Sequence, residues 1–290
     1  MNILITGSSG FIGRNFIKLS SGLNIREVDL LTTSPEEVDF SGIDSVLHLA
    51  AIVHHKDAVP VDQYFKINRD LAYEMALKSK EHSVNQFVLI STSKVYGDSS
   101  PLQDAWNEKS VCNPIDPYSQ SKYEAEKLVR SLADDKFKVA IIRPPLVYGP
   151  RVKANMLNLI KMVDICPILP FKGINNRRSM VYVGNLVALL QHVIEKQASG
   201  VFLTGDLNPI STSKLVEIIA HCLNKRRIMI KTPKLILRIA GMVKPEILER
   251  LYGSFVLDNS ITNSSLQFIP PYSCQEGIAE MVKWYKALEN

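Results

Sequence analysis

Closely spaced cysteines are absent from this chain of 290 residues. Its four cysteines lie far apart and form no C-x-x-C motif; they are Cys112, Cys166, Cys222 and Cys274. The spacing predicts neither a disulfide framework nor a zinc site. We therefore expect reduced thiols, no bound metal and a fold stabilised by its own core, which a chain of this length can bury.

Long apolar runs and a leader segment are also missing. The stretch from Leu235 to Val243 is interrupted by Arg238. It is well short of the ~20 residues that a membrane-spanning helix needs. The chain enters a strand-like run at Asn2 without the charged and apolar regions of a signal peptide. We expect a cytoplasmic protein with no membrane insertion.

Runs of like charge are missing as well. The formal net charge is +5, and the Lys and Arg residues are scattered along the sequence. This distribution does not indicate nucleic-acid binding, whereas a small anionic substrate is compatible with it. Hydrophobic residues make up 46% and charged residues 22% of the chain, as in ordinary globular proteins.

Six short runs of β-branched and aliphatic residues alternate with helical patterns. The runs are Ile3–Thr6, Ile25–Leu30, Ser45–Leu49, Gln86–Ser91, Lys138–Arg143 and Val201–Thr204. Such alternation predicts an α/β fold, with a doubly wound parallel sheet of the Rossmann type covered by helices on both faces. We take 1–150 as a nucleotide-binding domain and 151–290 as a smaller substrate-binding portion, with 178–204 returning to the sheet.

A glycine-rich turn, TGSSGFIG at 6–13, directly follows the first strand and opens a helix. Gly7 permits a tight turn, Gly10 lets the backbone approach a pyrophosphate, and Gly13 lets the helix pack against the sheet. The motif predicts an NAD or NADP site. We expect cofactor contacts from Gly7, Ser9, Gly10, Phe11, Ile12 and Gly13.

An acidic residue near the end of the second strand is expected to bind the adenosine ribose. Asp29 stands at this position, and Asp39 competes with it because the connection to the third strand is short. Arg26 could accept a 2′-phosphate, so the choice between NAD and NADP stays open at this point.

Tyr118 and Lys122 are spaced by four residues at the start of a helical stretch, which places both on one helix face. A cation beside a phenol lowers the phenol's pKa, as a general acid or base requires. A second pair, Tyr123 and Lys127, has the same spacing but faces elsewhere on the helix. Tyr118 is preferred because the triplet Ser91-Thr92-Ser93, at a strand end, offers a hydroxyl to the same reacting oxygen.

Five ordered motifs together resemble the extended short-chain dehydrogenase/reductases, in particular the nucleotide-sugar epimerase/dehydratase family. They are T-G-x-x-G-x-x-G at 6–13, HLAA at 48–51, STSKVYG at 91–97, Y-x-x-x-K at 118–122 and RPPLVYGP at 143–150. The resemblance implies that Tyr118 is the acid/base, that Lys122 lowers its pKa and holds the nicotinamide ribose, and that Thr92 binds the sugar oxygen. It also implies cofactor contacts from Leu49, Ala50, Ala51, Asn68 and Pro144. Asn68 could equally be a capping or surface residue.

The same resemblance implies a UDP-sugar substrate and a homodimer formed through a two-helix face. The candidate substrate-binding residues are Ser93, Lys94, Asn155, Arg178 and Arg250. A solvated surface role remains the alternative for Arg250.

Sugar-nucleotide 4,6-dehydratases carry an Asp-Glu pair after the active-site threonine, where this chain has Ser93 and Lys94. Dehydration is therefore not expected, and hydride transfer at sugar C4 remains. The first hypothesis is reduction of a UDP-4-keto-6-deoxy-N-acetylhexosamine, and the alternative is 4-epimerisation of UDP-glucose or UDP-N-acetylglucosamine. A catalytically silent NAD(P)-binding sensor is the alternative of another class, although this chain retains the tyrosine and the lysine.

Overall fold

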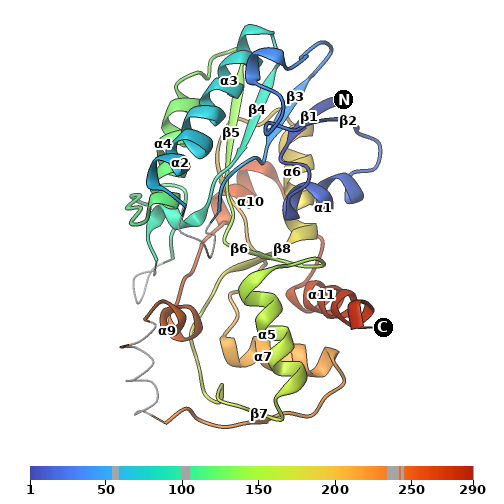
Figure 1. The fold of residues 1–290 in the computed structure, drawn as a ribbon, viewed down its shortest axis with the longest axis vertical. Helices are drawn as coiled ribbons and strands as arrows, with labels where there is room; N and C mark the ends of the chain where they lie inside the picture. The colour runs from blue at the N-terminus through green and yellow to red at the C-terminus, as the bar shows by residue number, and fades with distance from the viewer. Residues whose placement is uncertain (54–58, 99–104, 234–241, 243–244, 290) are drawn as a thin grey trace.

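The computed structural model describes residues 1–53, 59–98, 105–233, 242 and 245–289, without the side chains of 245–247, 250 and 289. The chain forms two lobes (Figure 1). The upper lobe is built on a parallel sheet, and the lower lobe contains α5 (Ala154–Ile165), α7 (Thr212–Cys222) and α11 (Cys274–Glu289).

The main sheet has six parallel strands in the order β2-β1-β3-β4-β5-β9. They are β1 (Asn2–Thr6), β2 (Asn24–Val28), β3 (Ser45–His48), β4 (Gln86–Ile90), β5 (Lys138–Arg143) and β9 (Gly200–Leu203). Every residue of β3 and β4 is buried, as expected for central strands covered on both faces. The predicted fold class is confirmed, with all six expected strands in one sheet.

Helices cover both faces of this sheet because alternate strand residues point to opposite sides. On one face, Ile3 and Ile5 of β1 pack with residues of α1 (Phe11–Leu19), α6 (Val183–Glu195) and α10 (Ser260–Leu266). On the other face, Leu4 packs in a cluster with residues of the helices on that side. These are α3 (Leu71–Glu81) and α4 (Pro117–Arg130); α2 (Val61–Phe65) and the π-helical η2 (Lys66–Asp70) lead into α3.

The crossover from β2 to β3 contains only a 3-10 turn, η1 (Pro35–Glu37). β1 lies directly between β2 and β3, and β2 forms one edge of the sheet. The exposed residues of β2 agree with this edge position.

The lower lobe has its own apolar core, to which α5, α7 and α11 contribute. Two short parallel pairs complete it: β6 (Leu146–Tyr148) with β8 (Met180–Tyr182), and β7 (Ile168–Leu169) with β10 (Ile228–Met229). β7 is only two residues long, and a strand this short carries no periodic signal in the sequence. A further helix, α9, spans Pro245–Tyr252.

Across the described part of the chain, no helix is both long enough and apolar enough to cross a membrane. The same residues contain no group of three or more His, Cys, Asp or Glu side chains arranged to hold a metal ion.

Candidate active site

The carboxyl ends of neighbouring strands bring the predicted site residues to one edge of the sheet. Gly7 follows β1, Ala50 comes shortly after β3, and Thr92 comes shortly after β4. Ligands of doubly wound sheets bind at this edge. The edge faces the junction with the lower lobe (Figure 1).

Two of the three glycines of the turn are required by the protein's own packing. Gly7 has a φ of +68°, and a Cβ there would lie 2.6 Å from the backbone nitrogen of Ala50. A Cβ on Gly13 would lie 2.6 Å from the carbonyl oxygen of Gly7. The backbone at the start of α1 therefore lies close against the strand ends. Side chains at Gly7 or Gly13 would prevent this close approach.

Gly10 differs, because a Cβ there would meet only the Gly7 carbonyl oxygen, at 3.1 Å. Its position in the loop is therefore open toward the outside, where a ligand can approach the backbone. The following helix begins at Phe11 without a side-chain cap on its first N–H groups. Uncapped N–H groups at a helix start suit an anion. The segment thus fits a dinucleotide pyrophosphate.

Asp29 lies immediately after β2, next to the glycine turn that follows β1. Its Oδ1 accepts a hydrogen bond from the backbone N–H of Leu31 at 3.0 Å, which orients the carboxylate. Asp39 is bound instead to Arg26, with Nη1 3.1 Å from Oδ2. This ion pair engages both Asp39, the other candidate for the ribose, and Arg26, the candidate for a 2′-phosphate. Asp29 is left as the acidic residue beside the turn.

Asn68 is fully buried in the π-helical η2, and its amide is committed to the protein. Its Oδ1 accepts the N–H of Ile52 at 2.8 Å, and its Nδ2 donates to the Ile52 carbonyl at 3.0 Å and to Ser121 Oγ at 3.1 Å. Both amide N–H donors are used. Asn68 therefore holds the chain after β3 against α4. The surface alternative for this residue does not match its burial.

The pKa of Tyr118 is raised to about 12, mainly by burial, and a hydrogen bond with Thr92 opposes the rise. The charge of Asp116 raises the pKa further. Lys122 was expected to lower this pKa. Instead, burial of the phenol dominates, and Lys122 is not among the groups that shift the pKa. The hydrogen bond brings together the two side chains that the sequence analysis expects at the same sugar oxygen.

Lys122 lies one turn after Tyr118 with 2% of its surface exposed. Burial lowers the pKa of its ammonium group to about 8, and the charge of Glu126, a further turn along α4, opposes this shift. His48 at the end of β3 faces the same region. Its pKa falls to about 3 because of burial and the charge of Lys122, so the imidazole is neutral. Its Nδ1 lies 3.0 Å from Thr6 Oγ1.

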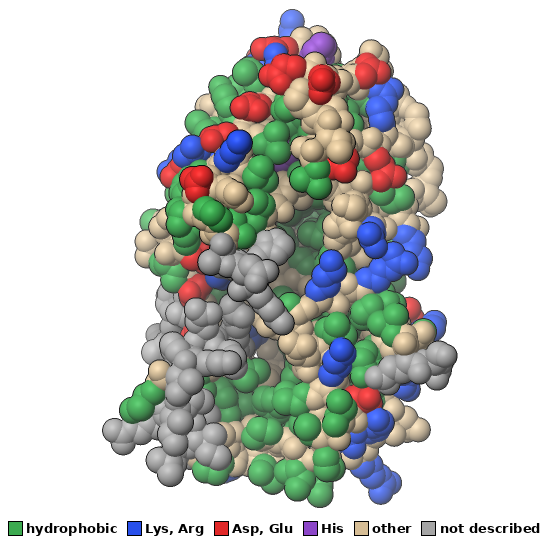
Figure 2. All heavy atoms as spheres, viewed as in Figure 1, with side chains coloured by type: hydrophobic (Ala, Val, Ile, Leu, Met, Phe, Trp, Pro, Cys, Tyr) green, Lys and Arg blue, Asp and Glu red, His purple; other side chains and the backbone are tan. Residues whose placement is uncertain are grey.

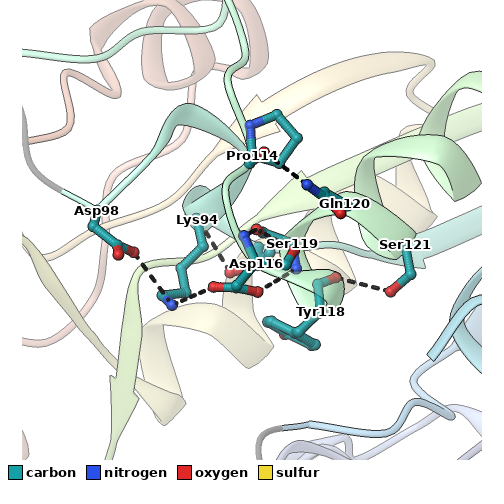
Figure 3. A network of polar contacts seen from close by, with 9 residues as sticks. Lys94, Asp98, Pro114, Asp116, Tyr118, Ser119, Gln120 and Ser121 are labelled. Carbon is teal, nitrogen blue, oxygen red and sulfur yellow. Dashed lines mark hydrogen bonds and ion pairs between the residues drawn. The ribbon is translucent and has the colours of Figure 1, made fainter. Parts of the chain in front are cut away.

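Figure 3 shows the polar contacts around the start of α4. Lys94 lies in η3 (Ser93–Tyr96), and its Nζ is 2.7 Å from Asp116 Oδ2 and 3.3 Å from Asp98 Oδ1. Asp116 is the N-cap of α4, and its Oδ1 accepts the N–H of Ser119 at 2.8 Å. The Lys94 ammonium, expected to contact substrate, is bound by these two carboxylates.

A second set of buried charges lies deeper, beneath the site. Arg143 of β5 donates through Nε to both carboxylate oxygens of Glu126, at 3.0 and 3.1 Å. It also donates through Nη1 to the Tyr96 hydroxyl at 2.8 Å. The Ser91 hydroxyl donates to Glu126. Ser91 therefore serves this network, which agrees with choosing Thr92 as the reactive hydroxyl.

The second Tyr-Lys pair lies on a different side of α4 from Tyr118 and Lys122. The Lys127 ammonium sits 4.4 Å from the centre of the Tyr123 ring, and Lys127 is exposed. Tyr123 contacts Cys112. The rotation between Tyr118 and Tyr123 along α4 is the one that the helical repeat requires.

The candidate residues on the substrate side are more dispersed. Asn155 is exposed in the first turn of α5, and Ser93 is buried with its N–H donating to the Pro144 carbonyl at 2.9 Å. Arg178 donates through Nη1 to the carbonyls of Glu249 at 3.3 Å and Gly253 at 3.1 Å. The side chain of Arg250 lies outside the described residues.

Sequence reasoning missed Asp116, Glu126 and Arg143 as parts of the site. Two signals were available. Asp116-Pro117 is a typical helix start, and Glu126 continues the spacing of four that links Tyr118 to Lys122. The pairing of Asp116 with Lys94 and of Glu126 with Arg143 has no local signal.

Figure 2 shows a hollow between the two lobes, bordered on one side by Lys and Arg side chains. A positive border of this kind attracts an anionic ligand. The hollow lies at the level of the lobe junction that the sheet edge faces (Figure 1).

A Rossmann sheet with this glycine turn and a Thr-Tyr-Lys set at its carboxyl edge defines a nucleotide-dependent enzyme of the short-chain dehydrogenase/reductase type. The chain belongs to the NAD dependent epimerase/dehydratase family, whose model matches residues 3–205. The resemblance to extended nucleotide-sugar enzymes is thereby confirmed.

Two curated relatives are similar to the chain over most of its length. UDP-glucose 4-epimerase of Vibrio cholerae is 32% identical, over 100% of this chain and 97% of that protein. N-acetyl-alpha-D-glucosaminyl-diphospho-ditrans,octacis-undecaprenol 4-epimerase of Escherichia coli O157:H7 is 26% identical, over 78% of this chain and 73% of that protein.

Among solved structures, UDP-glucuronic acid 4-epimerase from Bacillus cereus in complex with NAD matches with a TM-score of 0.77. It is 21% identical, and the match covers 100% of both chains. At this identity the likeness shows the fold.

Proposed function

We propose that this protein is an NAD-dependent UDP-sugar 4-epimerase. The observation that carries the proposal is the contact of Thr92 with Tyr118 at the sheet edge that also holds the glycine turn, with Lys122 buried one turn away. The relative from Vibrio cholerae, similar along the whole chain and named as a UDP-glucose 4-epimerase, supports the same reaction.

The residues divide the work of moving a proton at the sugar C4 oxygen. Tyr118 takes the proton from the hydroxyl when C4 is oxidised and returns it when C4 is reduced. Thr92 donates a hydrogen bond to the same oxygen. Lys122, buried one turn further along α4, would hold the nicotinamide ribose beside Tyr118. The bound dinucleotide supplies the acceptor and donor of hydride.

Reduction of a UDP-4-keto-6-deoxy-N-acetylhexosamine, the first hypothesis from sequence, is now the second candidate. It is still favoured by Lys94 after Thr92 and by the segment 143–155, which resemble reductases of that kind. The curated relatives support the epimerase better.

One experiment separates the candidates. Purified protein is incubated with UDP-glucose or UDP-N-acetylglucosamine and a catalytic amount of NAD, and the 4-epimer is followed by NMR. An epimerase forms the epimer with no net change in NADH absorbance. A reductase leaves both sugars unchanged and oxidises NADH or NADPH stoichiometrically with the 4-keto sugar. Cofactor binding without turnover in either assay would leave the silent sensor.

We propose NAD rather than NADP as the cofactor. Arg26, the candidate for a 2′-phosphate, is bound by the carboxylate and carbonyl of Asp39 and by the Ser41 carbonyl. Asp29 remains beside the turn, where its charge favours a free ribose hydroxyl over a phosphate. Calorimetric titration with both cofactors tests this. Tighter binding of NADP would contradict it.

Assembly and location are also proposals. A homodimer through α3 and α4, which pack side by side, would match the two-helix interface that the sequence resemblance implies. Light scattering of the purified protein tests the oligomeric state.

Four cysteines outside any disulfide support a cytoplasmic location.

A further inference from the structure

Lys94 and Asp116 connect the two segments that carry the proposed reactive hydroxyls. Lys94 follows Thr92 by two residues in η3, and Asp116 precedes Tyr118 by two residues at the start of α4. Lys94 Nζ and Asp116 Oδ2 are 2.7 Å apart (Figure 3). The ion pair therefore bridges the end of β4 and the first turn of α4.

Each partner is also tied to the backbone of its own segment. The N–H of Lys94 donates to Thr92 Oγ1 at 3.2 Å, so the residue that reaches Asp116 also orients the threonine oxygen. Asp116 accepts the Ser119 N–H with its other carboxylate oxygen, which caps α4. A displacement of the ion pair would thus be transmitted to both hydroxyls.

We propose that the Lys94–Asp116 ion pair is a positioning element that sets the separation of Thr92 from Tyr118 and balances the negative charge beside the Tyr118 phenol. The proposal rests on the acid–base role of Tyr118 given under the proposed function. It assigns Lys94 to holding the acid–base pair, in place of the direct substrate contact expected from sequence.

The electrostatic part follows from the surroundings of the phenol. Asp116 raises the pKa of Tyr118, and Lys94 brings an opposite charge onto the same carboxylate. The pair is partly shielded from solvent, with 34% and 21% of the two side chains exposed. Its charges are therefore screened less than those of a fully exposed pair. The other charged or titratable groups around the site are Asp98, Lys122, Glu126, His48 and Arg143.

Two single substitutions should act in opposite directions. Because the phenolate form accepts the substrate proton, kcat rises with pH through the pKa that Tyr118 has in the complex with NAD and substrate, and this limb is located first in the wild type. In Lys94→Met the charge of Asp116 is unbalanced, so this acid limb moves to higher pH. In Asp116→Asn the charge is lost while an oxygen remains for the helix cap, so the limb moves to lower pH. Shifts on the order of 0.5 to 1 pH unit are expected for charges at this range.

Three further variants sharpen the measurement. The double variant Lys94→Met with Asp116→Asn should return the acid limb close to its wild-type position. Lys94→Arg keeps the charge and should restore the wild-type profile. Lys127→Met removes a positive charge from the exposed side of α4 and serves as the matched control, with an unshifted limb expected. A purely structural role would lower kcat at every pH and leave the limb in place.

Wild-type turnover is measured first, so that failure of the proposed function is recognised separately. If the wild type is active and the two single variants shift the limb in the same direction or not at all, the positioning inference is overturned while the epimerase assignment stands. If the wild type turns over no UDP-sugar, crystal structures of Lys94→Met and Asp116→Asn decide. An unchanged separation of Thr92 Oγ1 from the Tyr118 hydroxyl overturns the inference, and a widened one supports it.

Discussion

Glu126 and Arg143 form an ion pair between α4 and β5 in which almost all of both side chains is buried, with 1% and 4% exposed. The pair lies one turn beyond Lys122, and it receives the Ser91 hydroxyl and binds the Tyr96 hydroxyl. Buried charges of this kind are tolerated only when the remaining polar atoms are hydrogen-bonded. The network therefore forms a rigid support below the Thr92–Tyr118 contact.

Replacing Glu126 with glutamine should destabilise the fold strongly. The substitution leaves the Arg143 guanidinium buried without its counter-charge, which costs about 3–5 kcal/mol. Urea unfolding measures the change. Glu81→Gln removes a partner of the more exposed pair with Lys78 and should cost less than about 1 kcal/mol. Equal losses in the two variants would show that the buried pair has no special weight.

The contribution of Lys122 to the stability of the protein should rise with pH between 8 and about 9.5. Burial lowers the pKa of its ammonium from 10.5 to about 8, so the unfolded chain binds more protons in this range. Unfolding then becomes less favourable as pH increases, by about 1.5 kcal/mol over the interval. The raised pKa values of Tyr118 and of the Cys274 thiol act in the opposite direction, so the contribution of Lys122 is read from the difference between the wild type and a Lys122 variant.

Lys122→Met should flatten this pH dependence. The measurement is the free energy of unfolding in urea at pH 8 and 9.5, for the wild type and the variant. Parallel increases in both proteins would mean that another group is responsible.

Tyr118→Phe should lose most of the turnover, roughly 10²–10⁴-fold, because the general acid and base is removed. Affinity for NAD should be nearly unchanged, since the pyrophosphate site lies at the glycine turn. Tyr123→Phe, on the same helix but beside Lys127, is the control and should keep its activity. Unchanged turnover in Tyr118→Phe would refute the assignment.

Gly10→Ala and Gly13→Ala should separate ligand binding from folding. A Cβ on Gly13 meets backbone atoms at 2.6 Å, so that variant should be destabilised by several kcal/mol and its Tm should fall. A Cβ on Gly10 meets only one oxygen, at 3.1 Å. Gly10→Ala should therefore keep much of its stability and lose NAD affinity, as measured by calorimetry. Full NAD affinity in Gly10→Ala would place the pyrophosphate elsewhere.

The sheet and the position of the candidate residues at its carboxyl edge could be predicted because their signals are local. A run such as Gln86–Ser91 reports a buried strand through its own composition, and the spacing of Tyr118 and Lys122 reports one helix face. Their positions at strand ends and at a helix start then place them at a common edge.

What the sequence did not show depends on partners far along the chain or on the environment. The burial of Lys122, the pairing of Lys94 with Asp116 and the commitment of the Asn68 amide to Ile52 each require the folded arrangement. The expected direction of the Tyr118 pKa shift was wrong for the same reason. Spacing along a helix says nothing about desolvation, which dominates this pKa.

The late position of β9 has a consequence for dividing the chain. This strand closes the outer side of β5, but the chain reaches it only after passing through β6, β7 and β8. A fragment ending at residue 150 would present β5 as an unpaired edge and would lack α6 over one sheet face, which invites aggregation. The chain therefore passes from the upper lobe to the lower lobe and back again. A cut at residue 150 does not yield two pieces that each retain a complete core.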